Sequence, residues 1–441
     1  MTAVLLAAAL AAQQPDLRDA AAVDKLLASL RTADPAVCEM AGRTLTNQWG
    51  WGGDLADEPM PAPMPTPMPV PIPMPFGGGS LGISSPNVSR GAGMALDAKV
   101  LAVFRTALRD QSRCVRRIAA RIVAREEPTW AASEFSTLIK DADAGLREIG
   151  LLGLGELEDP RTIDTIANAL GDRDVNVRAM AAWALGQLES IEAIAPLGKA
   201  LGDESPLVRR RAAWALGEIE DEAALSTLER ALRDRDATVR RIATWAIGEI
   251  ESAKAVAMLR TPLADSDADV RRTAIWALGE IEDASGVDVL APLVKDGDAR
   301  VRRMAVWALG QIESGRAVSV LAPAVRDSDR DVKLTALWAL GQIEDGAGVE
   351  VVTPALKDGD PDVRQMSAWA LGQIEDSTGV RSLTPLLEDP DVDVRIVAAW
   401  ALGQIESGSA LPALEAAKDD QSPAVRRAVE WAIRQIDDNR R

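Results

Sequence analysis

The stretch AAWALGQLE, residues 181–189, returns along the chain with small changes, for example as AAWALGEIE, AVWALGQIE and SAWALGQIE. Eight such copies place a glycine three residues after the tryptophan. Successive tryptophans are 31 residues apart, and a fixed period of this length is typical of a repeat protein. The indoles that share the register belong to Trp183, Trp214, Trp245, Trp276, Trp307, Trp338, Trp369, Trp400 and Trp431.

The register extends beyond the tryptophans. Leu152 and Arg121 occupy the same phase, and a further copy, DPAVCEMAGRTL at residues 34–45, lies out of phase because an insertion follows it. A chain of 441 residues would ordinarily form two or three domains, but stacked repeats bury one continuous core. The sequence therefore predicts an all-α fold, a right-handed α-solenoid of about twelve helix-turn-helix repeats of this period.

One repeat, such as VLAPLVKDGDARVRRMAVWALGQIE at residues 289–313, reads as helix, tight turn and helix. The second helix is predicted to follow Asp298, because Asp and Ser side chains accept hydrogen bonds from the free amides of a first helical turn. The equivalent position is Asp or Ser in every other repeat: Asp34, Ser112, Asp143, Asp174, Ser205, Asp236, Asp267, Asp329, Asp360, Asp391 and Ser422.

A second acid precedes the cap by two residues, so most turns read Asp-x-Asp. Calcium binding is one interpretation, but no glutamate follows at the EF-hand distance, and capping already explains one acid of each pair. We expect instead that the arginine after the repeated valine ties these acids together between neighbouring repeats. Those arginines are Arg178, Arg209, Arg240, Arg271, Arg302, Arg364, Arg395 and Arg426.

Helical periodicity predicts which face of the second helix is buried. At about 100° per residue, Val301, Ala305, Leu309 and Ile312 fall in one sector, which is the predicted core face. The indoles lie about 140° from the centre of that sector, so they are not predicted to be core residues. The residue before each indole is small or apolar except Glu430 in the last repeat, where a polar residue fits a terminal cap.

Composition excludes several classes of function. The chain contains no histidine, which removes Ser-His-Asp and Cys-His catalysis and every imidazole metal site. Its formal charge of -18 argues against nucleic acid as a partner, since nucleic-acid binding requires a basic surface. We therefore expect no catalytic residues, no metal and no cofactor.

The N-terminal region divides into three predicted parts. Residues 1–12 are an apolar segment that is either a secretory signal without the usual basic start or a first helix of the solenoid. Residues 13–46 form an N-terminal repeat, and the solenoid resumes over 96–441. A cleaved signal would make the protein secreted or periplasmic; without one it would be cytoplasmic.

The insertion over 47–95 contains PMPAPMPTPMPVPIPMP, residues 59–75. Alternating prolines favour an extended polyproline conformation without a packed core, so this part is predicted to be disordered. The insertion separates Cys38 from Cys114. These two either pair in a disulfide, which would require an oxidising compartment, or remain as two thiols.

The unit DxDxxVRxxAxxALGxIxD resembles the short HEAT-like repeats of the phycobilin lyase type, over nearly the whole chain outside residues 1–22 and about 47–95. The resemblance implies an α-solenoid whose second helices line the concave surface. It also implies an alternative function, a phycobilin-lyase-like enzyme or chaperone acting on a chromophore or client protein. Deoxyhypusine hydroxylase is similar too, but holds iron with His-Glu motifs that this chain lacks.

The tryptophans have two interpretations. Each indole could lie over the glycine of the preceding repeat and form a ladder, since glycine allows a close approach. Alternatively, Trp-x-x-x-Gln/Glu resembles the Trp and Asn with which armadillo repeats hold an extended peptide. This resemblance implies a scaffold that binds a protein or peptide, and the acidic residues favour a basic segment in that partner. We expect the scaffold to be monomeric. The candidate binding residues are Trp183, Trp214, Trp245, Trp276, Trp307, Trp338, Trp369, Trp400, Glu218, Glu249, Glu280, Gln311, Arg210, Arg241, Arg272 and Arg303.

Overall fold

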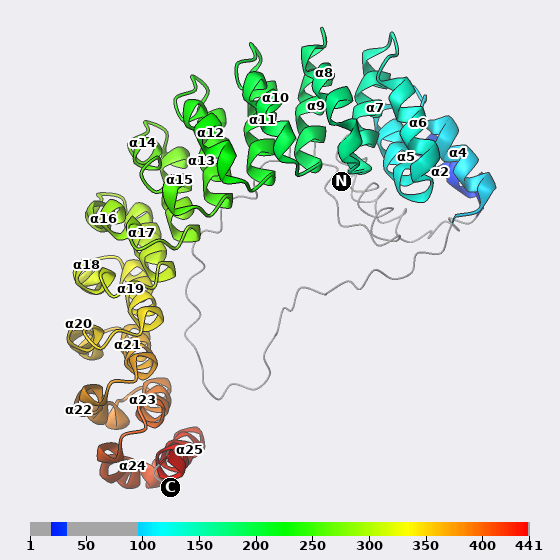
Figure 1. The fold of residues 1–441 in the computed structure, drawn as a ribbon. Coiled ribbons are helices and arrows are strands. Elements are labelled where there is room, and N and C mark those ends of the chain that lie inside the picture. The colour runs from blue at the N-terminus through cyan, green and yellow to red at the C-terminus, as the bar shows by residue number, and fades with distance from the viewer. Residues whose placement is uncertain (1–18, 33–95, 440–441) are drawn as a thin grey trace. The chain divides into compact units, whose positions relative to one another are not determined.

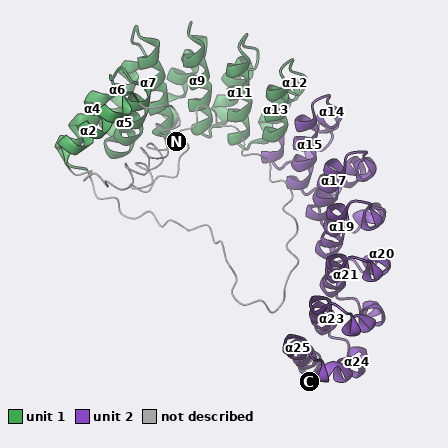
Figure 2. Cartoon of the chain, turned by 180° about the vertical axis from the view of Figure 1, so that it is seen from behind, with its two compact units in different colours: residues 1–61, 82–246 green, residues 62–81, 247–441 purple. Residues whose placement is uncertain are grey.

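The computed structural model describes residues 19–32 and 96–439, which contain helices and no strand (Figure 1). The chain divides into two compact units, whose described parts are residues 19–32 and 96–246 for unit 1 and 247–439 for unit 2 (Figure 2). The predicted signal, the insertion over 47–95, Asp34 and Cys38 lie outside the described residues.

Unit 1 is built from helix pairs in chain order. The second helices of successive repeats are packed side by side, α5 with α7, α7 with α9, and α9 with α11. The bounds are α2 Ala20–Leu30, α4 Ala98–Ala107, α5 Arg113–Glu126, α6 Pro128–Leu138, α7 Ala144–Glu156, α8 Ile163–Asn168, α9 Val175–Gln187, α10 Ile194–Ala200, α11 Pro206–Glu218, α12 Leu225–Ala231 and α13 Ala237–Glu249, within which the unit boundary falls.

Unit 2 repeats the same pattern, and its second helices α15, α17, α19, α21, α23 and α25 also pack consecutively. Its bounds are α14 Arg260–Leu263, α15 Ala268–Glu280, α16 Gly286–Leu290, α17 Ala299–Gln311, α18 Ala317–Leu321, α19 Arg330–Ile343, α20 Gly348–Val352, α21 Pro361–Ile374, α22 Val380–Leu383, α23 Val392–Gln404, α24 Leu411–Ala416 and α25 Pro423–Asn439. The described residues thus form an α-solenoid of consecutively packed helix pairs, as predicted.

The first helices of unit 2 are interrupted. α16, α20 and α22 are each followed at once by a 3-10 helix that carries a proline at its start, namely Pro292, Pro354 and Pro385. Proline has no amide hydrogen and clashes with the carbonyl four residues earlier, so it breaks the α-helical hydrogen-bond pattern. These first helices are consequently short, whereas the second helices run for three to four turns and form the regular layer of the fold.

The predicted caps are confirmed at the aspartates. Asp298 accepts a hydrogen bond from the Arg300 amide at 2.9 Å, and Asp174 caps α9 in the same way. Ser112 and Ser205 occupy the cap position but their side chains make no capping hydrogen bond. The aspartates therefore determine most of the helix starts by direct hydrogen bonding.

The predicted core face is also confirmed. Val301, Ala305, Leu309 and Ile312 are buried, and so are the residues that precede the indoles, from Ala182 to Ala399. Glu430, which takes that place in the last repeat, is exposed. The position before the indole is thus buried in every described repeat except the last, as a solenoid with a polar cap requires.

Candidate functional site

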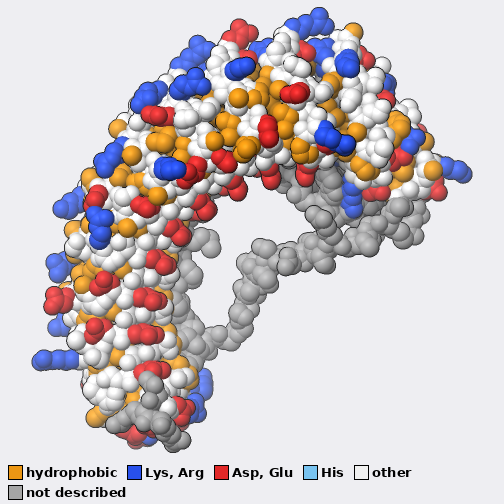
Figure 3. Space-filling model, in the orientation of Figure 1, with side chains coloured by type: hydrophobic (Ala, Val, Ile, Leu, Met, Phe, Trp, Pro, Cys, Tyr) orange, Lys and Arg blue, Asp and Glu red, His pale blue; other side chains and the backbone are white. Residues whose placement is uncertain are grey.

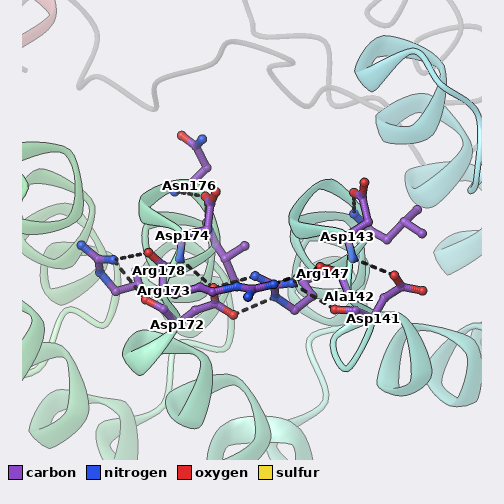
Figure 4. A network of polar contacts seen from close by, with 11 residues as sticks. Asp141, Ala142, Asp143, Arg147, Asp172, Arg173, Asp174, Asn176 and Arg178 are labelled. Carbon is purple, nitrogen blue, oxygen red and sulfur yellow. Dashed lines mark hydrogen bonds and ion pairs between the residues drawn. The ribbon is translucent and has the colours of Figure 1, made fainter.

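The turn between the two helices of each repeat carries a ladder of arginine–aspartate pairs (Figure 4). Arg147 donates two hydrogen bonds of 2.8 Å to the carboxylate of Asp172 in the next repeat, and its third nitrogen donates to the carbonyls of Asp141 and Ala142 at 3.0 Å. The predicted ties between repeats are confirmed for five of the predicted arginines, Arg178, Arg209, Arg302, Arg364 and Arg395. The pairs are Arg147–Asp172, Arg178–Asp203, Arg209–Asp234, Arg302–Asp327, Lys333–Asp358, Arg364–Asp389 and Arg395–Asp420. Arg271 and Arg426 donate instead to carbonyls of their own turns.

The first acid of most Asp-x-Asp turns is engaged in this ladder, whereas the side chains of Asp141 and Asp296 accept only from the amides of their own turns. Asp172 accepts from Arg147 and also from the backbone amide of Asp174 at 2.8 Å. The hydrogen bond from Arg147 holds the pKa of the Asp172 carboxyl below its usual range, and Arg302 lowers the pKa of Asp327 in the same way. The carboxylates of these turns are held by the protein's own cations, which explains the repeated acids without a ligand.

These pairs predict that the protein loses stability in acid. A carboxyl group with a lowered pKa in the folded state contributes stability above its unfolded pKa, near 3.9, and that contribution is lost as pH falls through the lower folded value. Burial raises the pKa of Glu156 and Glu280, which has the opposite sign, but the ladder aspartates are more numerous.

We therefore expect the urea midpoint followed by circular dichroism to fall below about pH 4. Asp327→Asn should be less stable at neutral pH and should depend less steeply on pH. A midpoint of the unsubstituted protein that stays constant or rises below about pH 4 would contradict this expectation.

At the other end of each second helix, nine glutamates occupy the left-handed region of the backbone. Their φ angles lie between 46° and 55°, and all are exposed. A side chain with a Cβ costs about 1 kcal/mol or more in this conformation, which normally selects glycine or asparagine. We call this set the glutamate row: Glu158, Glu189, Glu220, Glu251, Glu282, Glu313, Glu344, Glu375 and Glu406.

The glutamate row was not predicted from the sequence. The only sign of it in the sequence was the glutamate that ends the repeated motif, at a position after the helix where glycine or asparagine would be favoured. Apart from Glu406, its members make no ion pair with any residue in the described part of the chain. Acidic side chains follow one another along one edge of the repeats of unit 2 (Figure 3).

Each indole lies against the glycine of the preceding second helix. A Cβ placed on Gly341 would lie 2.6 Å from Cζ3 of Trp369, and one on Gly155 would lie 2.8 Å from Cζ3 of Trp183. The nine equivalent distances lie between 2.6 and 3.1 Å; those below 3.0 Å are too short for a real Cβ contact, and the others are unusually tight. The pairs are Gly155–Trp183, Gly186–Trp214, Gly217–Trp245, Gly248–Trp276, Gly279–Trp307, Gly310–Trp338, Gly341–Trp369, Gly372–Trp400 and Gly403–Trp431.

The chain itself supplies the comparison that links these glycines to the indoles. Ala124 stands at the glycine position of the one described repeat whose successor has Leu152 in place of tryptophan. Arg434 stands at that position in the last repeat, which no indole follows. Glycine is therefore present where the next repeat packs an indole and the alanine after it against this position, and absent where it does not.

The prediction that the indoles are not core residues is wrong for three of them. Trp214, Trp276 and Trp369 are only 7%, 8% and 7% exposed. The helical wheel of one repeat omits the neighbouring repeat, and it is the glycine-bearing helix that covers these rings. The other indoles are half-buried and remain partly exposed: Trp183, Trp245, Trp307, Trp338, Trp400 and Trp431.

The residue four positions after the indole adjoins the glutamate row. Trp276 forms a side-chain hydrogen bond with Glu280, and burial together with the charges of Glu251 and Glu282 raises the pKa of the Glu280 carboxyl. Glu218, Glu249 and Gln311, the other predicted members of this position, are half-buried. Around Trp276 the structure thus brings an indole, a Glu side chain and two members of the glutamate row together. We call the surface of the second helices that carries these positions within each unit the second-helix face.

The predicted arginines lie nearer the start of the second helices. Arg303 pairs with Asp331 of the next repeat at 3.2 Å, Arg272 pairs with Asp269 of its own helix, and Arg210 and Arg241 are half-buried. Arg272 and Arg303 are thus held by other acids of the solenoid, so they do not offset the charge of the glutamate row.

Cys114 lies half-buried in α5, and its predicted partner Cys38 is outside the described residues, so that disulfide stays a prediction. Within the described ranges, no helix is long and apolar enough to cross a membrane. The same part of the chain holds no group of three or more His, Cys, Asp or Glu residues arranged to bind a metal ion.

Comparison with known proteins identifies the repeat. A family model described as HEAT repeats matches residues 132–204, 194–267, 261–341, 318–391 and 380–441. Kap95p, solved with RanGDP, is similar in structure with a TM-score of 0.56 and 14% identity, covering 98% of this chain and 63% of that one.

Two further solved structures are similar at lower TM-scores. An engineered protein has a TM-score of 0.42 and 22% identity, and the match covers 76% of this chain and 98% of that one. The complex of CpcE and CpcF of phycocyanin lyase from Nostoc sp. has a TM-score of 0.33 and 20% identity, and the match covers 54% of this chain and 94% of that one. No curated protein matches the chain.

Proposed function

The chain belongs to the HEAT-repeat family, and we propose that it is a noncatalytic scaffold that binds a protein or an extended peptide along the second-helix face. The observation that carries the proposal is the glutamate row, which recurs at one exposed position in nine repeats although the backbone there would favour glycine. An exposed side chain that disfavours its own backbone conformation is better explained by an external partner than by folding.

Two features support a protein as that partner. The half-buried indoles remain partly exposed beside Gln and Glu side chains, and such amphipathic rings are common at protein interfaces. The structural likeness to Kap95p, whose solved complex concerns RanGDP, supports the same class of role. The absence of histidine from the sequence and the engagement of the turn acids in the ladder favour binding over catalysis.

A pull-down with the full chain tests this proposal. We expect it to recover a defined polypeptide that the purified chain then binds directly. Gln342→Lys, on the second-helix face, should weaken that binding about tenfold or more, which corresponds to about 1.4 kcal/mol. Ser319→Lys, on the exposed side of α18, is the matched control and should change the affinity less than about twofold.

Circular dichroism must show that both variants are folded. Equal effects of the two lysines, or a Gln342→Lys protein that binds normally, would contradict the proposed face. A purified protein that carries bilin absorbance, or that attaches a bilin to a client, would favour the lyase-like alternative instead.

A further inference from the structure

The two edges of the second-helix layer differ in how their negative charge is balanced. At the turn edge, each ladder aspartate faces an arginine or lysine of the preceding repeat, as Asp234 faces Arg209 at 2.7 Å. At the opposite edge, eight members of the glutamate row make no ion pair within the described part of the chain. Unbalanced negative charge therefore concentrates along the C-terminal ends of the second helices.

The glutamate row is not needed by the backbone that holds it. Glycine or asparagine would occupy the left-handed position at lower cost, by about 1 kcal/mol at each site. The next residue supplies a further acid in several repeats, for example Asp283 after Glu282 and Asp345 after Glu344. The charge of this edge is thus maintained at a cost to stability, and like charges along it repel one another.

The spacing of the row sets the form of a complementary partner. Packed helices lie about 8–10 Å apart, so successive glutamates are presented at about that interval. An extended chain advances about 3.3 Å per residue, and three residues span about 10 Å. One basic side chain at every third residue would therefore meet one glutamate after another.

We propose that the second-helix face of unit 2 binds an extended, Lys/Arg-rich polypeptide segment whose basic side chains recur at about every third residue and pair with the members of the glutamate row in that unit. The inference rests on the proposed function and specifies its partner. Partly exposed indoles beside the row offer contacts to the aliphatic stems and charges of lysine and arginine. The carboxylates of Glu251 and Glu282 lie close enough to Glu280 to raise the pKa of its carboxyl, so negative charge is concentrated at this point of unit 2.

Two synthetic peptides test the proposed spacing. One repeats Lys-Ser-Gly, and the other has the same length and composition with its lysines in a single block. We expect the periodic peptide to bind the full-length protein about tenfold more tightly or better, by calorimetry at physiological ionic strength. Equal affinities, or no measurable binding of the periodic peptide, would overturn the proposal.

Two triple variants test the residues. Glu313→Asn, Glu344→Asn and Glu375→Asn remove three charges from the row with a residue that tolerates the left-handed backbone. We expect this variant to bind the periodic peptide about tenfold less tightly or worse, with an unfolding temperature that is unchanged or higher. The control variant removes three exposed charges from the first-helix layer, at Glu350→Gln, Glu388→Gln and Glu415→Gln, and should bind within about twofold of the parent.

The outcomes separate this inference from the proposed function. Equal losses in both triple variants would mean that net charge alone attracts the peptide and would overturn the inference. A pulled-down partner that depends on Gln342 but not on the glutamate row would leave the proposed function standing and the inference wrong.

Discussion

Replacing Trp369 with alanine is expected to lower the free energy of unfolding by about 3–5 kcal/mol, the range for truncating a buried aromatic side chain. The ring is 7% exposed and fills the space above Gly341. Without the indole, the two second helices face each other across a cavity that neither backbone can close fully. Urea unfolding of the full-length protein, followed by circular dichroism, measures the loss.

A double-mutant cycle shows whether the glycine and the indole act as a pair. Gly341→Ala alone should cost about 1–3 kcal/mol, because its Cβ would collide with Cζ3 of Trp369. Combined with Trp369→Leu it should cost less than the sum of the single changes, by about 1 kcal/mol or more. The chain already uses this combination at Ala124 and Leu152. Additive single effects would contradict the pairing.

Arg209→Met is expected to cost about 3–5 kcal/mol, because it leaves a largely buried carboxylate without its cation. The Arg209 side chain is 4% exposed, donates to Asp234 at 2.7 and 2.8 Å, and donates to the carbonyls of Asp203 and Glu204. Methionine keeps much of the volume of the side chain and removes every one of these donors.

Arg161→Met is the matched control for this change. Arg161 also pairs with an aspartate, Asp159, but its side chain is 89% exposed, so we expect a loss below about 1 kcal/mol. Similar losses in the two variants would mean that burial does not determine the strength of the ladder. A loss in Arg209→Met that remains in the background of Asp234→Asn would assign the effect to the carbonyl contacts instead.

The sequence alone was sufficient for the features that are local to one repeat. The Asp298 cap, the Val301 and Leu309 core positions and the Arg302 tie follow from helical periodicity and from the hydrogen-bonding capacity of each side chain. The spacing of Asp and Arg also predicted pairs between repeats, because a solenoid brings equivalent turns of neighbouring repeats together.

The features that depend on the neighbouring repeat were harder to predict. A helical wheel placed the indole of Trp276 away from the core, but its ring is covered by the helix that carries Gly248. Glu344 reads as an ordinary last helical residue, because glutamate is a good helix former and seldom adopts a left-handed backbone. Its conformation, and hence the glutamate row, became visible only in the folded chain.

Hydrogen exchange of the full-length protein, with and without its pulled-down partner, tests most directly whether the second-helix face binds that partner. We predict that binding of the partner slows amide exchange at the C-terminal ends of the second helices, including α17, α19 and α21. Amide exchange in the first helices α18 and α20 should not change. Slowed exchange confined to α18, α20 and the other first helices would contradict the account.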